Sequence, residues 1–208
     1  MIAVIDYGLG NLFSLVCSLK YLGAEAQITA DPKVIAAADK LILPGVGAFG
    51  DAMEKLNALE LTELLQKQAA EGKPLLGICL GMQLLFEESE EFGIHKGLGL
   101  LPGRVASLAD DLSAEGSSLK TPQMGWNSLD IRKPDCPILK NCGQGDHVYF
   151  VHSYYAKDCD DVLAASVDYQ MTVPATVWKD NVYGCQFHPE KSGKVGLSIL
   201  EAYLKEVR

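Results

Sequence analysis

Short apolar runs alternate with helix-period patterns along the first half of the chain. Four of these runs have the length and composition of strands: residues 2–6, 26–29, 40–43 and 74–78. After the first run, apolar residues recur at i, i+3, i+4 and i+7 and predict a helix that Asn11 would cap and Gly23 would end. Residues 51–70 contain a further helical pattern. This alternation is typical of parallel strands in a sheet that helices cover on both faces.

The pattern changes after Leu98. Six short strand candidates follow, separated by turn residues: 105–108, 128–131, 147–151, 162–166, 175–178 and 182–187. The chain finishes with an amphipathic helix over residues 192–207, and the polar stretch 110–118 is predicted to be a mobile loop. Without a repeat or linker, we expect one α/β domain over residues 1–208. Its central sheet would be mostly parallel and flanked by helices, with antiparallel strands in the C-terminal half.

Composition places the chain among globular proteins with a full core. Its 208 residues are 48% hydrophobic and 22% charged, and the net charge is −9. This negative charge disfavours binding to nucleic acid or to anionic lipid. No apolar stretch approaches the roughly 18 residues of a membrane span, and the first residues lack the pattern of a signal peptide. We therefore expect a cytoplasmic protein that binds neither membrane nor nucleic acid.

Six cysteines are scattered along the chain with no CxxC pair and no histidine at zinc spacing. We therefore predict no metal site. In a reducing compartment a cysteine is usually a small buried apolar residue, and we expect this of most of the six. Cys79 is the exception, because of its neighbours.

One glycine cluster has the letters of a nucleotide-binding loop. Gly45, Gly47 and Gly50 match G-x-G-x-x-G between a predicted strand and a predicted helix. A dinucleotide site also needs an acidic residue at the end of the following strand, where this chain has Cys79. We therefore expect no cofactor.

The strongest local pattern is Gly77-Ile78-Cys79-Leu80-Gly81, between an apolar strand and a predicted helix. Strand, sharp turn and helix form the nucleophile elbow of hydrolases, here with cysteine in place of serine. The glycines would leave room for the strained turn, and the N-terminus of the helix would favour a thiolate. The alternative is a buried core cysteine with glycines that permit close packing.

A nucleophilic thiol needs a base, and His188 is the best candidate of four histidines. It ends an apolar strand, Pro189 favours an extended backbone there, and Glu190 is near enough to orient the imidazole. The other three histidines fit exposed, sheet-packed or core positions. A simple strand-ending turn at residues 188–190 is the alternative interpretation.

Together these segments resemble the class I, triad-type glutamine amidotransferases. The family's two most specific motifs are Gly-Ile-Cys-Leu-Gly-Met-Gln at residues 77–83 and His-Pro-Glu-Lys-Ser at 188–192, and the resemblance extends over the whole chain. Residues 6–11, 44–49, 124–127 and 150–154 resemble one subfamily, the glutaminase subunits of imidazole glycerol phosphate synthase in histidine biosynthesis.

The resemblance implies particular roles. Cys79 would attack the side-chain amide of glutamine, and His188, oriented by Glu190, would move the protons. The positions that match the family's glutamine-binding residues are Gly45, Val46, Gly47, Leu80, Gln83, Ser153 and Tyr154. Among these, Leu80 and Val46 would donate backbone N–H groups to the oxyanion.

The resemblance also implies a heterodimer with a (β/α)8-barrel cyclase subunit that receives the ammonia and activates the glutaminase. Its products would be imidazole glycerol phosphate and an aminoimidazole carboxamide ribotide. Asn11, Trp126, Tyr149 and Lys191 match positions that face this partner. Their alternative roles are a helix cap, a core aromatic, a sheet residue and a solvated charge.

Two other functions remain compatible with the sequence. A glutaminase that serves another synthase, such as one that amidates a surface sugar, would keep the same three catalytic residues. A non-enzymatic Rossmann-like binding module would keep the fold and lack the activity.

Overall fold

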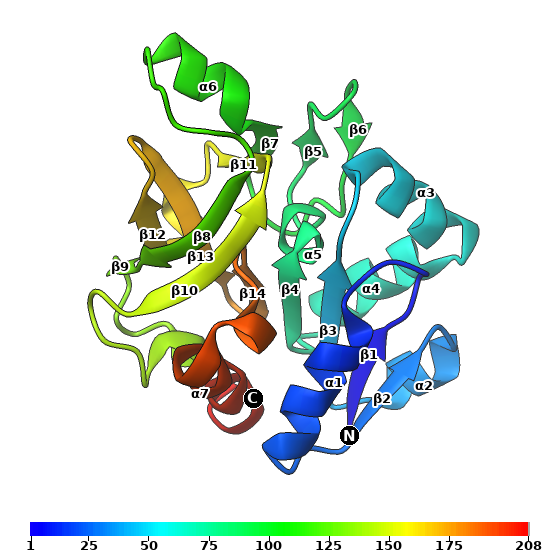
Figure 1. Ribbon diagram of the computed structural model, residues 1–208. Helices are drawn as coiled ribbons and strands as arrows, with labels where there is room; N and C mark the ends of the chain where they lie inside the picture. The colour runs from blue at the N-terminus through cyan, green and yellow to red at the C-terminus, as the bar shows by residue number, and fades with distance from the viewer. Residues whose placement is uncertain (208) are drawn as a thin grey trace.

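An eight-stranded mixed sheet runs through the computed structural model, which describes residues 1–207 (Figure 1). Its strand order is β2-β1-β3-β4-β14-β13-β12-β9. These strands are β1 (Ile2–Ile5), β2 (Ala26–Thr29), β3 (Lys40–Gly45), β4 (Leu75–Cys79), β9 (Asp130–Ile131), β12 (Leu163–Asp168), β13 (Thr172–Lys179) and β14 (Val182–Cys185). The first five in spatial order are parallel, and β13, β12 and β9 continue antiparallel. The expected α/β class is confirmed.

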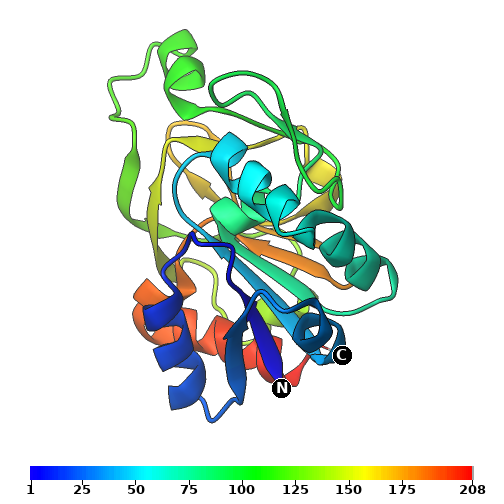
Figure 2. The same ribbon diagram turned by 90° about the vertical axis from the view of Figure 1, so that its right-hand side faces the viewer.

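Helices cover both faces of this sheet. They are α1 (Leu12–Tyr21), α2 (Pro32–Ala37), α3 (Phe49–Ala58), α4 (Leu61–Ala70), α5 (Leu80–Gln83), α6 (Leu108–Ala114) and α7 (Gly193–Lys205). Figure 2 shows α1 and α7 on one side of the sheet and α3 and α4 on the other. Side chains along each strand alternate between the two faces. In β1, Ile2 and Val4 pack against α1 and α7, whereas Ala3 and Ile5 pack against α2 to α4.

Two smaller sheets lie beside the large one. The first joins β8 (Gln123–Ser128) to β10 (His147–His152), and the second has the order β11-β7-β5-β6. Its strands are β11 (Tyr154–Lys157), β7 (Arg104–Ser107), β5 (Glu88–Ser89) and β6 (His95–Lys96). Three short 3-10 helices complete the described elements: η1 (Pro137–Leu139), η2 (Asp160–Val162) and η3 (Pro189–Lys191).

Several expected elements differ in the structure. The helix expected within residues 51–70 is two helices, because Glu60 has a left-handed backbone (φ 57°) between α3 and α4. The expected mobile loop 110–118 contains most of α6, whose Leu108 and Leu112 are buried and whose first turn is capped by Ser107. The strand expected at 128–131 is divided between β8 and β9, and α2 was not expected at all.

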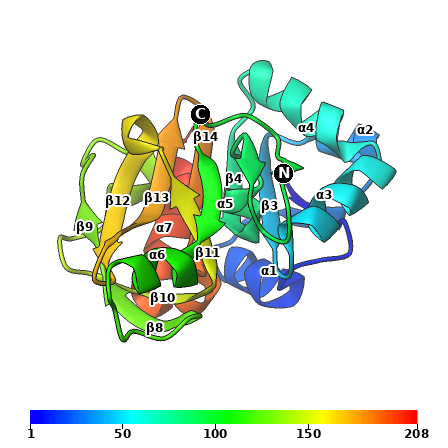
Figure 3. The same cartoon turned by 90° about the horizontal axis from the view of Figure 1, so that it is seen from above.

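The carboxyl ends of β3, β4 and β14 meet at the centre of the sheet. In register, Gly45 on β3 lies beside Cys79 on β4, and Cys185 on β14 lies beside Ile78. Figure 3 shows β4 between β3 on one side and β13 and β12 on the other. Segments that follow these strand ends are therefore held close together.

Candidate active site

Cys79 stands at the sharp turn between β4 and α5. Its φ of 56° and ψ of −113° are rarely adopted by residues other than glycine. A Cβ atom on Gly81 would overlap the Leu43 carbonyl, and one on Gly77 would come within 2.5 Å of the Gly81 carbonyl oxygen. Backbone contacts thus require both flanking glycines, as a nucleophile elbow does.

His188 follows β14 and reaches the same place from the neighbouring strand. Its Nδ1 lies 2.9 Å from the Glu190 Oε1, and both side chains are almost fully buried. Because a carboxylate accepts, Nδ1 carries the hydrogen, and Nε2 is left for Cys79. The backbone N–H of His188 also donates to the Tyr149 carbonyl at 3.0 Å. The geometry is that of a nucleophile, a base and an orienting carboxylate.

The pKa of His188 reflects opposing influences. Burial, the largest of them, lowers the pKa, but the interactions with Cys79 and with the Glu190 carboxylate raise it to about 9. At neutral pH His188 is therefore an imidazolium, ready to give a proton.

His152 lies on the same cavity but differs in charge. Burial lowers its pKa to about 4, against the effect of its bond to the Tyr154 carbonyl. The Nδ1 to carbonyl distance is 3.0 Å, and since a carbonyl only accepts, Nδ1 carries the hydrogen. His152 is therefore neutral at pH 7 and does not supply the proton. The sequence alone is compatible with a buried core histidine at this position.

Asn11 departs from the expected capping role. Its side chain caps no backbone N–H of α1, and its Nδ2 donates to the Glu190 Oε1 at 3.2 Å. The Glu190 carboxylate thereby receives two donors on one oxygen, from His188 and from Asn11. Asn11 does occupy the N-cap position of α1, but its side chain makes this charge-assisted bond in place of a capping bond.

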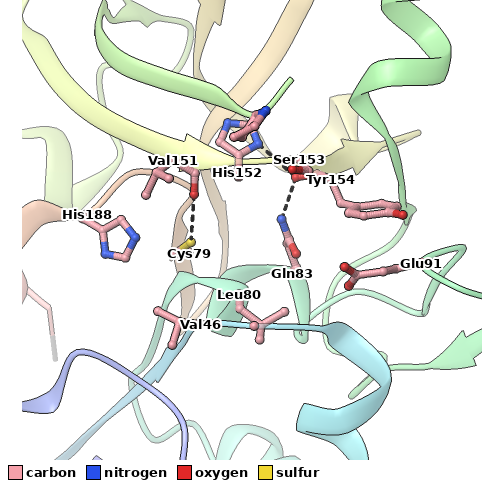
Figure 4. Close-up of a pocket in the computed structure, with 12 residues that line it drawn as sticks. Val46, Cys79, Leu80, Gln83, Glu91, Val151, His152, Ser153, Tyr154 and His188 are labelled. Carbon is pink, nitrogen blue, oxygen red and sulfur yellow. Dashed lines mark hydrogen bonds between the residues drawn. The ribbon is translucent and has the colours of Figure 1, made fainter. Parts of the chain in front are cut away.

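A cavity of about 380 Å³ opens in front of Cys79 (Figure 4). Its walls come from Val46, Gly47, Cys79, Leu80, Gln83, Glu91, Pro122, Val151, His152, Ser153, Tyr154 and His188. In Figure 4, His188 lies on one side of Cys79, and Gln83, Tyr154 and Glu91 lie on the other. Two catalytic candidates, Cys79 and His188, and six of the seven glutamine-binding candidates thus line one space.

Gly45, the seventh candidate, lies behind the cavity wall. A Cβ atom there would come within 2.5 Å of the Tyr7 Oη and 2.9 Å of the Gly81 nitrogen. The Tyr7 hydroxyl donates to the Pro44 carbonyl at 2.8 Å, so this side of β3 is closely packed. Gly45 is needed for that packing.

Gln83 and Gln186 form a buried amide pair under the cavity floor. Gln83 Nε2 donates to the Tyr154 carbonyl at 2.7 Å and to Gln186 Oε1 at 3.0 Å. Gln186 Nε2 in turn lies 3.9 Å from the Cys79 sulfur. Sequence analysis did not single out Gln186, which lies two residues before His188 on the apolar run.

Glu91 is a cavity residue that sequence analysis missed. Its carboxylate Oε2 accepts from the Phe49 N–H at 2.7 Å, at the start of α3. Burial raises the pKa of Glu91, and the Phe49 hydrogen bond partly opposes this. The only signal in the sequence is that Glu91 belongs to an acidic run, residues 87–91.

The same contact bears on the G-x-G-x-x-G interpretation. In dinucleotide sites a phosphate occupies the N-terminus of the helix that follows the glycines. Here the Glu91 carboxylate already occupies that end of α3. Gly50, moreover, is required by the His95 ring, which a Cβ atom would approach to 2.8 Å. Gly45 and Gly50 are thus explained by close packing and Gly47 by its positive φ of 99°, and the end of α3 that would bind a phosphate already holds a carboxylate.

The four partner-facing candidates gather near the His188 end of the site. Trp126 on β8 is 53% exposed and packs edge to face on Tyr149 of β10, with ring centroids 6.0 Å apart. Lys191 is exposed at the end of η3, directly after Glu190. Asn11 lies between this group and the carboxylate. Exposed Phe13 and Met124 add apolar surface to α1 and β8.

Among residues 1–207, no group of three or more His, Cys, Asp or Glu side chains is arranged to hold a metal ion. None of the helices in this part of the chain is long and apolar enough to cross a bilayer.

A buried cysteine on a nucleophile elbow, beside a histidine that a carboxylate orients, is the kind of site that α/β enzymes use for acyl transfer. The family model for class-I glutamine amidotransferases matches residues 3–206, and the chain belongs to this family. It is accordingly an enzyme, a glutamine amidotransferase.

Curated relatives are similar over nearly their whole length. A protein of Syntrophotalea carbinolica is 52% identical over 204 residues, which cover 98% of each chain. One of Bacillus subtilis is 51% identical and covers 99% of this chain and 96% of its own. Both are named imidazole glycerol phosphate synthase subunit HisH.

Solved structures share the fold at lower identity. A chain of PurLQS from Thermotoga maritima superposes with a TM-score of 0.75 at 20% identity, and covers 100% of this chain and 98% of its own. The glutaminase domain of Trypanosoma brucei CTPS, solved with bound acivicin, gives 0.67 at 16% identity over 98% and 93%. At these identities the likeness concerns the fold.

Proposed function

We propose that this chain is the glutaminase subunit of an imidazole glycerol phosphate synthase. It hydrolyses L-glutamine to glutamate and ammonia, and delivers the ammonia to a (β/α)8-barrel cyclase subunit. One arrangement carries the proposal: Cys79 on a strained elbow, facing a His188 whose Nδ1 is held 2.9 Å from Glu190. The names of relatives about 50% identical support the choice of synthase.

In the first step the Cys79 sulfur attacks the side-chain amide carbon of glutamine. The amide nitrogen takes a proton from the His188 imidazolium, the C–N bond breaks, and ammonia leaves a thioester on Cys79. His188 then takes a proton from water as the water oxygen attacks the thioester carbon. Glutamate leaves, and the thiolate and imidazolium are restored.

The oxyanion of each step needs donors that are already in place. The backbone N–H groups of Leu80, directly after the nucleophile, and of Val46, after β3, are our candidates. Such a donor is worth about 2.7 to 4 kcal/mol in the transition state. Gly47 follows with a left-handed φ of 99°, which lets the chain bend around the cavity mouth.

The position of Cys79 also orients the substrate. Since the side-chain amide must lie at the sulfur, the α-carbon end of glutamine extends toward Glu91 and Tyr154 (Figure 4). We assign the Glu91 carboxylate to the α-ammonium group. Gln83 and Ser153 would complete the binding site, and Gly45 would support it by close packing behind the cavity wall.

The partner surface comprises Asn11, Trp126, Tyr149 and Lys191. Trp126 is exposed there, and the exposed Phe13 and Met124 lie on α1, which begins after Asn11, and on β8, which contains Trp126; aromatic residues and methionine are enriched at protein interfaces. Through Asn11 this surface is one hydrogen bond from Glu190. A partner bound here would act directly on the group that orients the base, which supports activation by the cyclase.

The test is a glutaminase assay of this chain with and without the cyclase subunit. Cys79→Ala is expected to abolish glutamine-dependent synthesis and to leave ammonia-dependent synthesis intact, because only ammonia release needs the thiol. Equal loss with both nitrogen donors would show a structural role for Cys79. Activity with a different synthase alone would reassign the partner.

A further inference from the structure

The tip of the β5–β6 hairpin carries an aromatic residue, Phe92, whose conformation and exposure are both unfavourable. Phe92 has a φ of 55°, a left-handed conformation that is rare for bulky residues. Its side chain is nevertheless 84% exposed, so little burial compensates for the backbone strain. Neither feature favours the folded state. Strain of this kind, kept at the edge of an active site, points to a role in function.

Phe92 touches one residue of the glutamine cavity. Its ring packs edge to face on Tyr154, with centroids 6.3 Å apart and an interplanar angle of 63°. The backbone of Tyr154 is fixed from inside the molecule, because its carbonyl accepts from Gln83 at 2.7 Å and from His152 at 3.0 Å. Its side chain is only partly buried. The contact with Phe92 therefore restrains the Tyr154 ring, which the interior of the protein does not enclose.

The hairpin tip is itself anchored to the cavity. Glu91, the residue before Phe92, is tied through its carboxylate to the Phe49 N–H. Glu91 and Tyr154 lie on the same side of the cavity, away from His188 (Figure 4). Under the proposed function, this is where the α-carbon end of glutamine binds.

We propose that Phe92 is a positioning residue for glutamine: its ring holds the Tyr154 ring beside the Glu91 carboxylate. The ligand group recognised there is the primary ammonium of an α-amino acid. A carboxylate supplies the opposite charge, and the face of a fixed aromatic ring attracts the same cation. The inference rests on the proposed function and deepens it. Because the side-chain amide reacts at Cys79, Phe92 acts on binding and leaves the chemical step alone.

The test measures glutamine binding in the full chain with Cys79→Ala, which prevents turnover. Equilibrium dialysis with radiolabelled L-glutamine gives the Kd of this parent and of its variants. Phe92→Ala is expected to raise the Kd roughly three- to tenfold, the range for one lost aromatic pair. Phe92→Tyr keeps the ring and is expected to keep the Kd. The matched control is Ile94→Ala, which removes a 68% exposed side chain from the same hairpin and should leave the Kd unchanged.

A second readout separates positioning from fold stability. Phe92→Gly removes both the ring and the left-handed strain, so it is expected to weaken binding as Phe92→Ala does while raising the Tm. An unchanged Kd in Phe92→Ala, failure of Phe92→Tyr to retain affinity, or an equal effect of Ile94→Ala would overturn the inference. Absence of glutamine binding by the Cys79→Ala parent, both alone and with the cyclase subunit present, would instead overturn the proposed function, and the inference with it.

Discussion

His188 and His152 line one cavity, yet only His188 is charged at neutral pH. The difference comes from their partners: Glu190 offers a charge to His188, whereas His152 meets a neutral backbone carbonyl. Burial lowers the pKa of both, and only His188 has partners that outweigh it. A substitution at Glu190 should therefore change the titration of His188 directly, and that of His152 only through the His188 charge that helps to lower its pKa.

Glutamine hydrolysis by the complex is expected to fall as the pH rises through about 9, where His188 loses its proton. Above that pH no imidazolium remains to protonate the departing amide nitrogen. Glu190→Gln removes one of the charges that raise this pKa, so the fall should begin at lower pH. Profiles of kcat/KM against pH for both proteins check this.

The substrate provides an internal control for that experiment. The α-amino group of glutamine also loses a proton at high pH, but it does so equally for both proteins. The difference between the profiles therefore reports His188. Identical profiles would contradict the assignment of Glu190 as the orienting group.

The same raised pKa makes the stability of the folded protein depend on pH. The folded pKa of His188 is about 9, above its ordinary value of 6.5. Its contribution to stability is thus complete below pH 6.5 and is lost as the pH rises through about 9. Urea unfolding across this range should show a decline that is smaller in Glu190→Gln.

Gly45 and Tyr7 should be energetically coupled. Tyr7→Phe loses the hydrogen bond to Pro44 and is expected to cost about 1 kcal/mol. Gly45→Ala forces a methyl group against the Tyr7 hydroxyl and should cost about 1 to 3 kcal/mol. Removing the hydroxyl relieves that clash, so the double variant should unfold less readily than the sum predicts. Additive unfolding free energies would show that the Gly81 nitrogen, not Tyr7, limits the space.

At the level of elements, Lys40 fastens the last helix to the first part of the sheet. Its Nζ donates to the carbonyl oxygens of Tyr203, Leu204 and Val207 at 2.6 to 2.9 Å, at the C-terminal end of α7. Carbonyls there have no partner within the helix, and a cation also suits the negative end of the helix dipole. The contact ties α7 to β3, across most of the chain.

Lys40→Met keeps the apolar stem and removes the charge. It is expected to lower the free energy of unfolding by about 1 to 3 kcal/mol, because three carbonyls lose a charged donor. Lys33→Met, at an exposed lysine of α2, is the control and should stay within about 0.5 kcal/mol. Equal effects in urea titrations would show that Lys40 contributes only its stem.

The elements that followed from the sequence are those with a clear apolar period. The first four strands and α1 and α7 have one, and the structure confirms them. The break between α3 and α4 was not predictable, because Glu60 adopts its left-handed backbone without glycine or proline. By contrast, α2 had a usable signal: Asp31 caps it by accepting from the Lys33 N–H, and Pro32 begins it.

For the whole molecule, the two specific motifs predicted which residues would meet, since residues 77–83 and 188–192 follow neighbouring strands. Glu91 could not be predicted, because four glutamates lie between residues 87 and 91 and only the folded hairpin decides which one reaches the cavity. The hydrogen bond from Asn11 to Glu190 could not be predicted either, because the two residues lie far apart in sequence and close in space.

Under the proposed function, binding of the cyclase subunit should depend on Lys191. If its charge pairs with a partner carboxylate, Lys191→Ala should weaken the complex or its activation by about 1 to 3 kcal/mol and leave the Tm unchanged. Lys194→Ala removes an exposed charge nearby on α7 and is the control. Titration calorimetry with the cyclase, together with stimulated glutaminase rates, measures both effects. Unchanged affinity and activation in Lys191→Ala would exclude this contact.

The central position of β4 has a consequence during synthesis. One neighbour, β3, is made before it, but β14 begins only at Val182, near the end of the chain. A ribosome adds roughly 5 to 20 residues per second, so the apolar edge of β4 stays unpaired for several seconds before β14 is synthesised. Unpaired edges of this kind invite aggregation, and nascent chains should need a chaperone for that interval. Cys79 is likewise translated long before His188, so the newborn thiol spends its first seconds without a base.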